Sequence, residues 1–205
     1  MRAALQFAQV HLYGHSWGTM LALDYVLTHP ARLNSLVLAS PCADIPRFAR
    51  DVRALLAAMP PEIRDAVQRN EAAGTFETEE YQEATFAFYQ RHLCRVDPLP
   101  EPLQRSMAGL NPQVYGTMWG ASEFTISGNL AGYDRTARLG ELTLPVLLTC
   151  GRFDEVTPAA TAEYQSQIPN ARMVIFENSA HVAMLEEPEA YVQTLREFLR
   201  QVEAG

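Results

Sequence analysis

Ser16, at the centre of Gly14-His15-Ser16-Trp17-Gly18, is the first residue whose surroundings suggest chemistry. Residues 9–15 form an apolar run rich in strand formers, and the apolar positions of residues 17–28 follow helical spacing. A sharp turn from a strand into a helix strains the serine backbone and lifts its hydroxyl above the edge of a sheet. Glycines on either side relieve the crowding. The setting predicts a nucleophile, with an ordinary serine in a tight turn as the alternative.

The helix that follows Ser16 should assist the same chemistry. Its N-terminus points free N–H groups and a positive dipole end at negative charge that develops on a substrate. The backbone N–H of Trp17 is therefore expected to be one donor to an oxyanion.

A serine hydroxyl is a poor nucleophile at neutral pH and needs a base whose tautomer is fixed by an acid. Asp154 follows an apolar run that ends at Gly151, and His181 follows another that ends near Phe176. Both runs are typical of strands, so both side chains should lie on loops beside Ser16 at one edge of a sheet. We therefore expect these three residues to form a catalytic triad. A helix cap at Asp154 and a solvated loop position for His181 are the alternatives.

The other histidines lack this placement after a strand. They are expected to pack or to lie on the surface, and the side chain of the one next to Ser16 should point away from the turn: His11, His15, His29 and His92.

The start of the chain predicts a parallel sheet. A strand at residues 9–15, a helix at 17–28 and a second strand at 35–39 form a βαβ unit. Strands return at 145–151 and 171–176, accompanied by helices near 158–167 and 188–202. This order is typical of an α/β fold.

Residues 42–135 differ in pattern from the flanking segments. They contain helical stretches, such as 52–59, 62–73 and 79–92, and no strand of comparable strength. We predict an α/β core formed by residues 1–41 and 136–205, with residues 42–135 inserted as a helical cap or lid.

Composition excludes several classes of protein. The formal net charge is −8, which argues against nucleic acid or an anionic membrane as the main partner. No apolar stretch reaches the roughly 18 residues that span a membrane, and Met1–Gln6 lack the apolar segment of a signal peptide. The three cysteines, Cys42, Cys94 and Cys150, are widely spaced, so neither a disulfide framework nor a zinc site is predicted. A cytoplasmic location is expected.

Four segments together resemble the proline iminopeptidase (prolyl aminopeptidase) family of α/β-hydrolases. They are residues 14–20 (Gly-His-Ser-Trp-Gly-Thr-Met), 123–128 (Glu-Phe-Thr-Ile-Ser-Gly), 151–155 (Gly-Arg-Phe-Asp-Glu) and 179–181 (Ser-Ala-His). The likeness spans nearly the whole chain and is looser in the first half of the helical region. It implies an α/β-hydrolase fold with a helical cap, and serine peptidase chemistry without cofactor or metal.

The resemblance also implies a site for the free amine of the substrate. Two glutamates of the family hold the substrate's α-ammonium group, and the matching positions here are Glu123 and Glu155. Carboxylates in a partly desolvated pocket can recognise the free N-terminus of a peptide through charge-assisted hydrogen bonds. Four nearby side chains are expected either to wall an apolar pocket for proline or to pack in the core: Tyr115, Met118, Trp119 and Phe124.

One departure from the family concerns the start of the chain. The resemblance implies early strands and an H-G-G-P-G-type loop before the serine, and the loop would supply a second oxyanion donor. Here the strand before Ser16 begins close to residue 1, so the N-terminal strands are expected to be missing and this strand to form an exposed apolar edge. Losing one oxyanion donor costs roughly 10²–10³ in rate. We hypothesise that the chain is partial and that its function is that of the complete protein.

These observations predict a serine aminopeptidase that releases an N-terminal residue, preferably proline, through an acyl-enzyme. Its substrate would be a small peptide or amino-acid amide with a free N-terminus. One alternative is another small-molecule hydrolase, such as an esterase, lactonase or amidase. The other is an incomplete hydrolase domain that binds without catalysis. The sequence does not indicate an oligomeric state.

Overall fold

Four parallel strands form a sheet at the centre of the protein. The computed structural model describes residues 7–205, so Met1–Gln6, where the absence of a signal peptide was predicted, lie outside it. The strand order is β1 (Val10–His15), β2 (Leu33–Ala39), β3 (Val146–Gly151) and β4 (Ala171–Phe176). β2 and β3 are almost entirely buried, in keeping with their apolar runs at residues 36–39 and 146–148.

Within residues 7–205, β1 lies at one edge of the sheet and pairs only with β2. Its Tyr13 is 44% exposed. The predicted parallel α/β architecture, with the strand before Ser16 at an edge, is confirmed.

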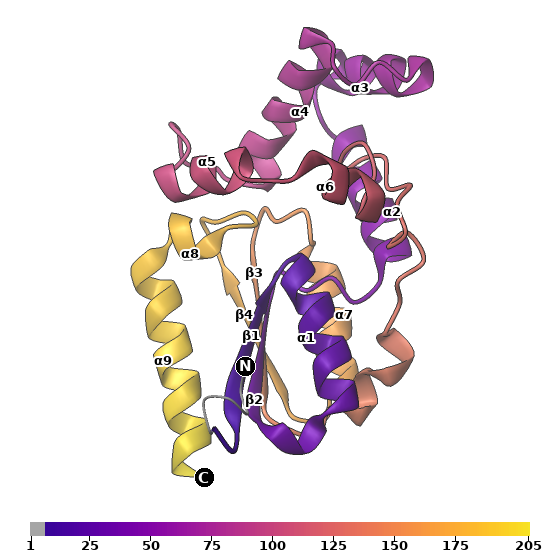
Figure 1. The fold of residues 1–205 in the computed structure, drawn as a ribbon. Coiled ribbons are helices and arrows are strands. Elements are labelled where there is room, and N and C mark those ends of the chain that lie inside the picture. The colour runs from indigo at the N-terminus through magenta and orange to yellow at the C-terminus, as the bar shows by residue number, and fades with distance from the viewer. Residues whose placement is uncertain (1–6) are drawn as a thin grey trace.

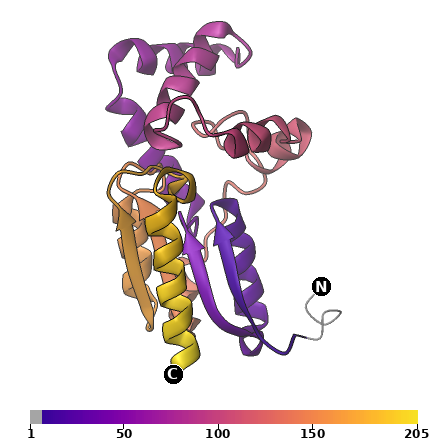
Figure 2. The same cartoon turned by 90° about the vertical axis from the view of Figure 1, so that its left-hand side faces the viewer.

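Helices cover both faces of the sheet (Figure 1). On one face lie α1 (Trp17–Thr28) and α7 (Pro158–Gln167), and their residues Leu23 and Tyr164 belong to one buried apolar cluster with Leu36 and Leu148 of the central strands. On the other face lies α9 (Pro188–Ala204), which crosses in front of the sheet in Figure 2 and packs Phe198 against Leu147. The core is therefore built on both sides of β2 and β3.

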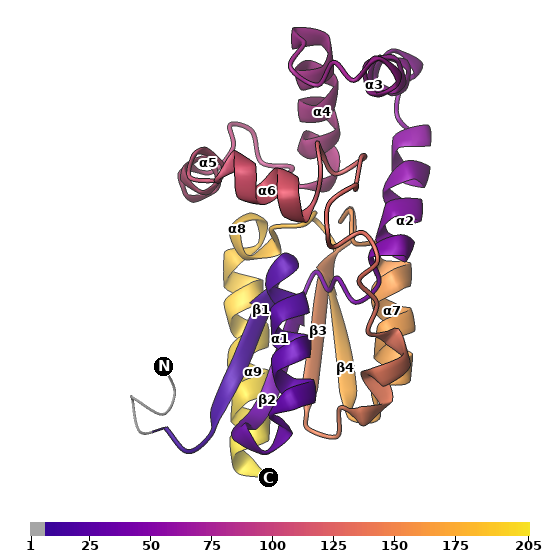
Figure 3. The same cartoon turned by 45° about the vertical axis from the view of Figure 1, so that its right-hand side comes forward.

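Five helices lie above the carboxyl ends of the strands (Figures 1 and 3). These cap helices are α2 (Ile45–Ala57), α3 (Pro61–Ala73), α4 (Glu79–His92), α5 (Glu101–Ala108) and α6 (Pro112–Met118). α2, α3 and α4 contribute to one apolar cluster, which includes Phe48 and Phe88 and extends to Met20 of α1. Leu103 of α5 packs in a separate cluster with Val182. The place of the cap helices over this edge leaves any site there covered from above. The domain limits at residues 42 and 135 remain a prediction.

Several helix limits differ from the sequence-based expectation. α2 begins at Ile45 rather than near Val52, because the Asp44 side chain accepts a hydrogen bond from Arg47 N at 2.8 Å and caps the helix. α5 and α6 were not predicted. All three carry a proline in the first turn, where its missing N–H costs nothing.

The remaining elements are short. They are the 3-10 turns η1 (Pro30–Arg32) and η2 (Thr136–Glu141), and α8 (Ala183–Glu186), which links the His181 loop to α9. Among residues 7–205, no helix is long and apolar enough to cross a membrane.

Candidate active site

Ser16 occupies a strained turn between β1 and α1. Its backbone has φ 54° and ψ −126°, and Ser40 is the only other non-glycine residue in the described range with a positive φ. Ser16 N donates to Ala39 O at 2.9 Å, and Thr19 donates to Ser16 O through both its backbone N, at 2.8 Å, and its hydroxyl, at 2.6 Å. A conformation that costs of order 1–3 kcal/mol persists only where its surroundings determine it in this way.

The two glycines around Ser16 have different roles. A Cβ at Gly14 would lie 2.4 Å from Gly18 O and 2.9 Å from Thr19 N, so only glycine fits. A Cβ at Gly18 would meet nothing within 4 Å. The expected relief of crowding therefore applies to Gly14, and Gly18 supplies the oxygen that Gly14 must avoid.

This difference gives a matched pair of variants. Gly14→Ala should lower the free energy of unfolding by about 3 kcal/mol or more, since backbone atoms cannot move aside cheaply. Gly18→Ala lies in the first turn of α1 and should be neutral or stabilising by up to about 1 kcal/mol. Urea unfolding of both variants measures the difference, and equal losses of stability would contradict this account of the turn.

Asp154 and His181 meet at the same edge of the sheet. His181 Nδ1 donates to Asp154 Oδ1 at 2.8 Å, and Val156 N donates to the same oxygen at 2.8 Å. Both side chains are buried, at 1% and 4% exposure. The contact orients the imidazole and leaves its Nε2 as the nitrogen that can take a proton.

The pKa of His181 is raised to about 9 by its acidic neighbours. Burial is the largest single influence and lowers it, but the charge and hydrogen bond of Asp154 and the charges of Glu155 and Glu123 together outweigh burial. The imidazole can act as a base only when neutral, so its basic form gains population as the pH rises toward 9.

Two observations place this pair close to the serine turn. The rings of His15 and His181 have centroids 4.8 Å apart, and Glu155, whose Oε1 lies 3.9 Å from His181 Nδ1, lines the same cavity as Ser16. Among residues 7–205 the Ser16 hydroxyl accepts no capping hydrogen bond from α1. Catalytic hydrogen bonds are often long in unliganded enzymes and tighten when substrate binds.

Three further side chains support the loops of this site, and no local motif identifies them. His15 Nε2 donates to the His181 backbone O at 2.9 Å. Burial, followed by the charge of His181, lowers the pKa of His15 to about 4, so it is neutral at pH 7 and supports the loop that carries His181. His92, at the end of α4, donates from Nδ1 to Phe153 O at 2.8 Å. Ser40 donates to Asp154 Oδ2 at 2.6 Å. Only the packing of distant segments could have revealed these contacts.

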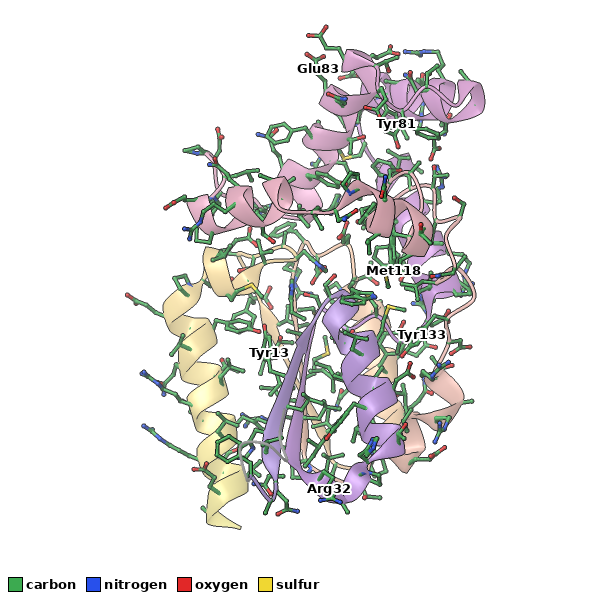
Figure 4. The ribbon with its side chains drawn as sticks, viewed as in Figure 1. Tyr13, Arg32, Tyr81, Glu83, Met118 and Tyr133 are labelled. Atoms are coloured by element: carbon green, nitrogen blue, oxygen red, sulfur yellow. The ribbon has the colours of Figure 1, made fainter. Side chains whose placement is uncertain are left out.

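A cavity of about 330 Å³ opens beside Ser16 between the sheet edge and the cap helices. Most of its lining is apolar, and the lining residues are Ser16, Trp17, Cys42, Phe48, Leu110, Asn111, Val114, Tyr115, Met118, Trp119, Glu123, Leu130 and Glu155. Met118 lies above the sheet edge, beneath the cap, in Figure 4. Phe124 is not among these residues. It is 3% exposed and packs edge-on against Phe88 at 4.9 Å, so its place is in the core of the cap.

The cavity contains two carboxylates in an apolar setting. Glu155 is 3% exposed, and its Oε2 has no hydrogen-bond partner among residues 7–205. Glu123 Oε1 accepts a hydrogen bond from Tyr115 OH at 2.6 Å. Burial above all raises the pKa of Glu123, and burial followed by the charge of Glu123 raises that of Glu155 well above its ordinary value. A cation bound between them would offset both costs.

Trp17 is the first residue of α1 and borders the cavity. The first N–H groups of a helix have no partner within the helix, so the Trp17 N–H is placed to donate to an oxygen above Ser16. Among the described residues, no three His, Cys, Asp or Glu side chains gather in a way that could hold a metal ion.

A parallel sheet with helices on both faces, a strained serine after one strand and a buried acid–imidazole pair after two others define a class: the protein is an α/β hydrolase. A family model described as "alpha/beta hydrolase fold" matches residues 1–188.

Individual relatives indicate which family of α/β hydrolases the chain resembles. The chain is 40% identical to a proline iminopeptidase of Heyndrickxia coagulans over 203 residues, which are 98% of this chain and 70% of that protein. Two crystal structures superpose closely. That of VinJ has a TM-score of 0.94 and 34% identity, covering 98% of this chain and 69% of VinJ. That of a Mycobacterium smegmatis proline iminopeptidase has a TM-score of 0.92 and 35% identity, covering 99% of this chain and 69% of that protein.

The chain belongs to the proline iminopeptidase family, as the resemblance of its motifs predicted. It spans between 63% and 70% of the length of the first four curated relatives that it matches.

Proposed function

We propose that this chain carries the catalytic residues of a serine aminopeptidase that releases an N-terminal residue, preferably proline, from small peptides or amino-acid amides. The observation that carries the proposal is the buried carboxylate of Glu155, which lines the same apolar cavity as Ser16 and whose Oε2 has no partner in the part of the chain that the structure describes. A free α-ammonium group matches that oxygen in charge and hydrogen bonding.

In the proposed reaction, Ser16 attacks the carbonyl carbon of the N-terminal residue. His181 takes the serine proton and then gives it to the leaving amine, while Asp154 orients the imidazole and stabilises its charged form. A water molecule, activated by the same imidazole, then releases the acyl group from Ser16.

The polar groups of the cavity would position the substrate for this attack. The Trp17 N–H would hold the oxyanion, and Glu123 and Glu155 would bind the ammonium group. Tyr115 and Trp119 border the cavity and would contact the apolar ring of proline. The cap helices would cover the site and favour short substrates.

We also propose that the protein is located in the cytoplasm. Cys42, Cys94 and Cys150 are all free and buried, which supports the reducing, cytoplasmic setting that the sequence predicted.

Comparing proline-p-nitroanilide with its N-acetylated form tests the proposal directly. An aminopeptidase should hydrolyse the free amine with a kcat/KM at least about 10²–10³ times higher, because acetylation removes the charge that the glutamates bind and leaves their carboxylates unpaired. Equal kcat/KM values for the two substrates would instead favour an amidase or esterase that does not recognise the free amine. Binding of proline amide without turnover, together with an unreactive Ser16, would favour a domain that binds without catalysis.

A further inference from the structure

Ser40 is a buried polar residue to which the proposed reaction assigns no role. It directly follows β2, is 3% exposed and has a φ of 48°. Its backbone N–H donates to Thr149 O of β3 at 2.7 Å, so the pairing of the two central strands continues up to this residue. The sheet therefore fixes the position from which the Ser40 side chain starts.

The hydroxyl of Ser40 meets the oxygen of Asp154 that the histidine leaves free. Its Oγ lies 2.6 Å from Asp154 Oδ2 and 3.1 Å from the His181 backbone O. A hydroxyl has one proton, and the shorter contact to a charged acceptor is the stronger of the two. The other oxygen, Oδ1, already accepts from His181 Nδ1 and Val156 N.

Hydrogen bonds therefore reach both oxygens of the Asp154 carboxylate. Val156 N, in the same loop, donates to Oδ1. Among the described residues Ser40 supplies the side-chain donor to Oδ2. Without it, the carboxylate could rotate about its side-chain bond, and the buried Oδ2 would lose its donor. Its alignment with the imidazole would then be less well determined.

We infer that Ser40 is a positioning residue that acts on the reaction through Asp154. Its hydroxyl keeps the carboxylate in the orientation that points Oδ1 at His181 Nδ1, and so keeps the imidazole in place. The inference deepens the proposed function and depends on it only for the step at which His181 moves a proton. A positive φ at a serine fits this role, since strain persists where a site requires a particular side-chain direction.

The chain offers a control on β2, the strand that Ser40 follows. Ser35 of β2 is also buried, at 0% exposure, and its hydroxyl also lies within hydrogen-bond distance of a distant side chain, at 2.7 Å from His11 Nδ1. Ser35→Ala therefore removes a buried hydroxyl and its contact with a side chain without touching Asp154. A role of Ser40 in stability alone would make the two alanine variants behave alike.

The test compares Ser40→Ala, Ser40→Gly and Ser35→Ala in the melting temperature, in kcat and KM for proline-p-nitroanilide, and in the pKa of His181 followed by NMR of labelled imidazole. Glycine adopts a positive φ without strain, so the glycine variant shows the effect of losing the hydroxyl apart from any effect of backbone strain. Both Ser40 variants should lower kcat by about 10- to 100-fold with little change in KM, as expected for a misplaced catalytic group. Ser35→Ala should change the melting temperature alone.

The pKa of His181 gives a second readout that needs no turnover. Burial lowers this pKa, whereas Asp154, Glu155 and Glu123 raise it, and the neutral ring of His15 lies alongside. A poorly aligned Asp154 should let the pKa fall in both Ser40 variants but not in Ser35→Ala. If no substrate is hydrolysed, the proposed function fails while this titration still decides the inference. An unchanged His181 pKa in both Ser40 variants would overturn it, as would an unchanged kcat.

Discussion

Ser16→Ala should reduce the turnover of proline-p-nitroanilide by about 10⁶-fold, as loss of the nucleophile does in serine proteases. The residual rate should come from the bound substrate and the remaining oxyanion donor, because Trp17 N–H and the glutamates are untouched. Steady-state kinetics against the uncatalysed rate measure the effect. A loss of less than tenfold would show that another group attacks the substrate.

The same position separates activity from stability. Ser16 has a φ of 54°, a conformation that glycine adopts readily and alanine does not. Ser16→Gly should therefore unfold with a free energy roughly 1 kcal/mol higher than that of Ser16→Ala, although both are inactive. Equal stabilities would mean that the turn is not strained in solution.

Glu155→Gln should lower kcat/KM for proline-p-nitroanilide by about 100-fold, because it removes a charge-assisted hydrogen bond to the ammonium group. The N-acetylated substrate should be almost unaffected, so the preference for a free amine should collapse. The variant should be as stable as the parent or more so, since the buried Oε2 of Glu155 has no partner within the described residues.

Glu83→Gln is the control for this substitution. Glu83 lies on α4 at the outer end of the cap and is exposed (Figure 4). This substitution changes the formal net charge by the same amount without altering the cavity. The kcat/KM values for proline-p-nitroanilide and for its N-acetylated form should both stay within about twofold of the parent, because surface substitutions of this kind have small effects. If Glu155→Gln kept the preference for a free amine, the carboxylates would have to be assigned another role.

Local patterns were sufficient to predict the sheet and the loops that follow its strands. The run before Ser16, the helix after it and the strands that precede Asp154 and His181 all carry their signal within a few residues, and all four strands lie where these patterns indicated. Loops after parallel strands share an edge, so the meeting of Asp154 with His181 followed from topology.

Other features depend on contacts between segments far apart in the chain. Ser40 lies more than a hundred residues from Asp154, and nothing in its neighbourhood marks it as a partner of a carboxylate. Phe124 could equally have faced the cavity or the core, because an aromatic residue in a loop has no periodic pattern to orient it. α5 and α6, which carry a proline in the first turn, have only 8 and 7 residues and are too short to show a clear helical period.

The central claim is that Ser16 is a nucleophile activated by the buried imidazole of His181. Reaction of the chain with a fluorophosphonate, followed by digestion and mass spectrometry, tests it without assuming any substrate. The account predicts an adduct on Ser16 whose rate of formation increases as the pH rises toward about 9, where His181 loses its proton. An unmodified Ser16, or labelling of folded protein that persists in His181→Ala at the parent rate, would contradict it.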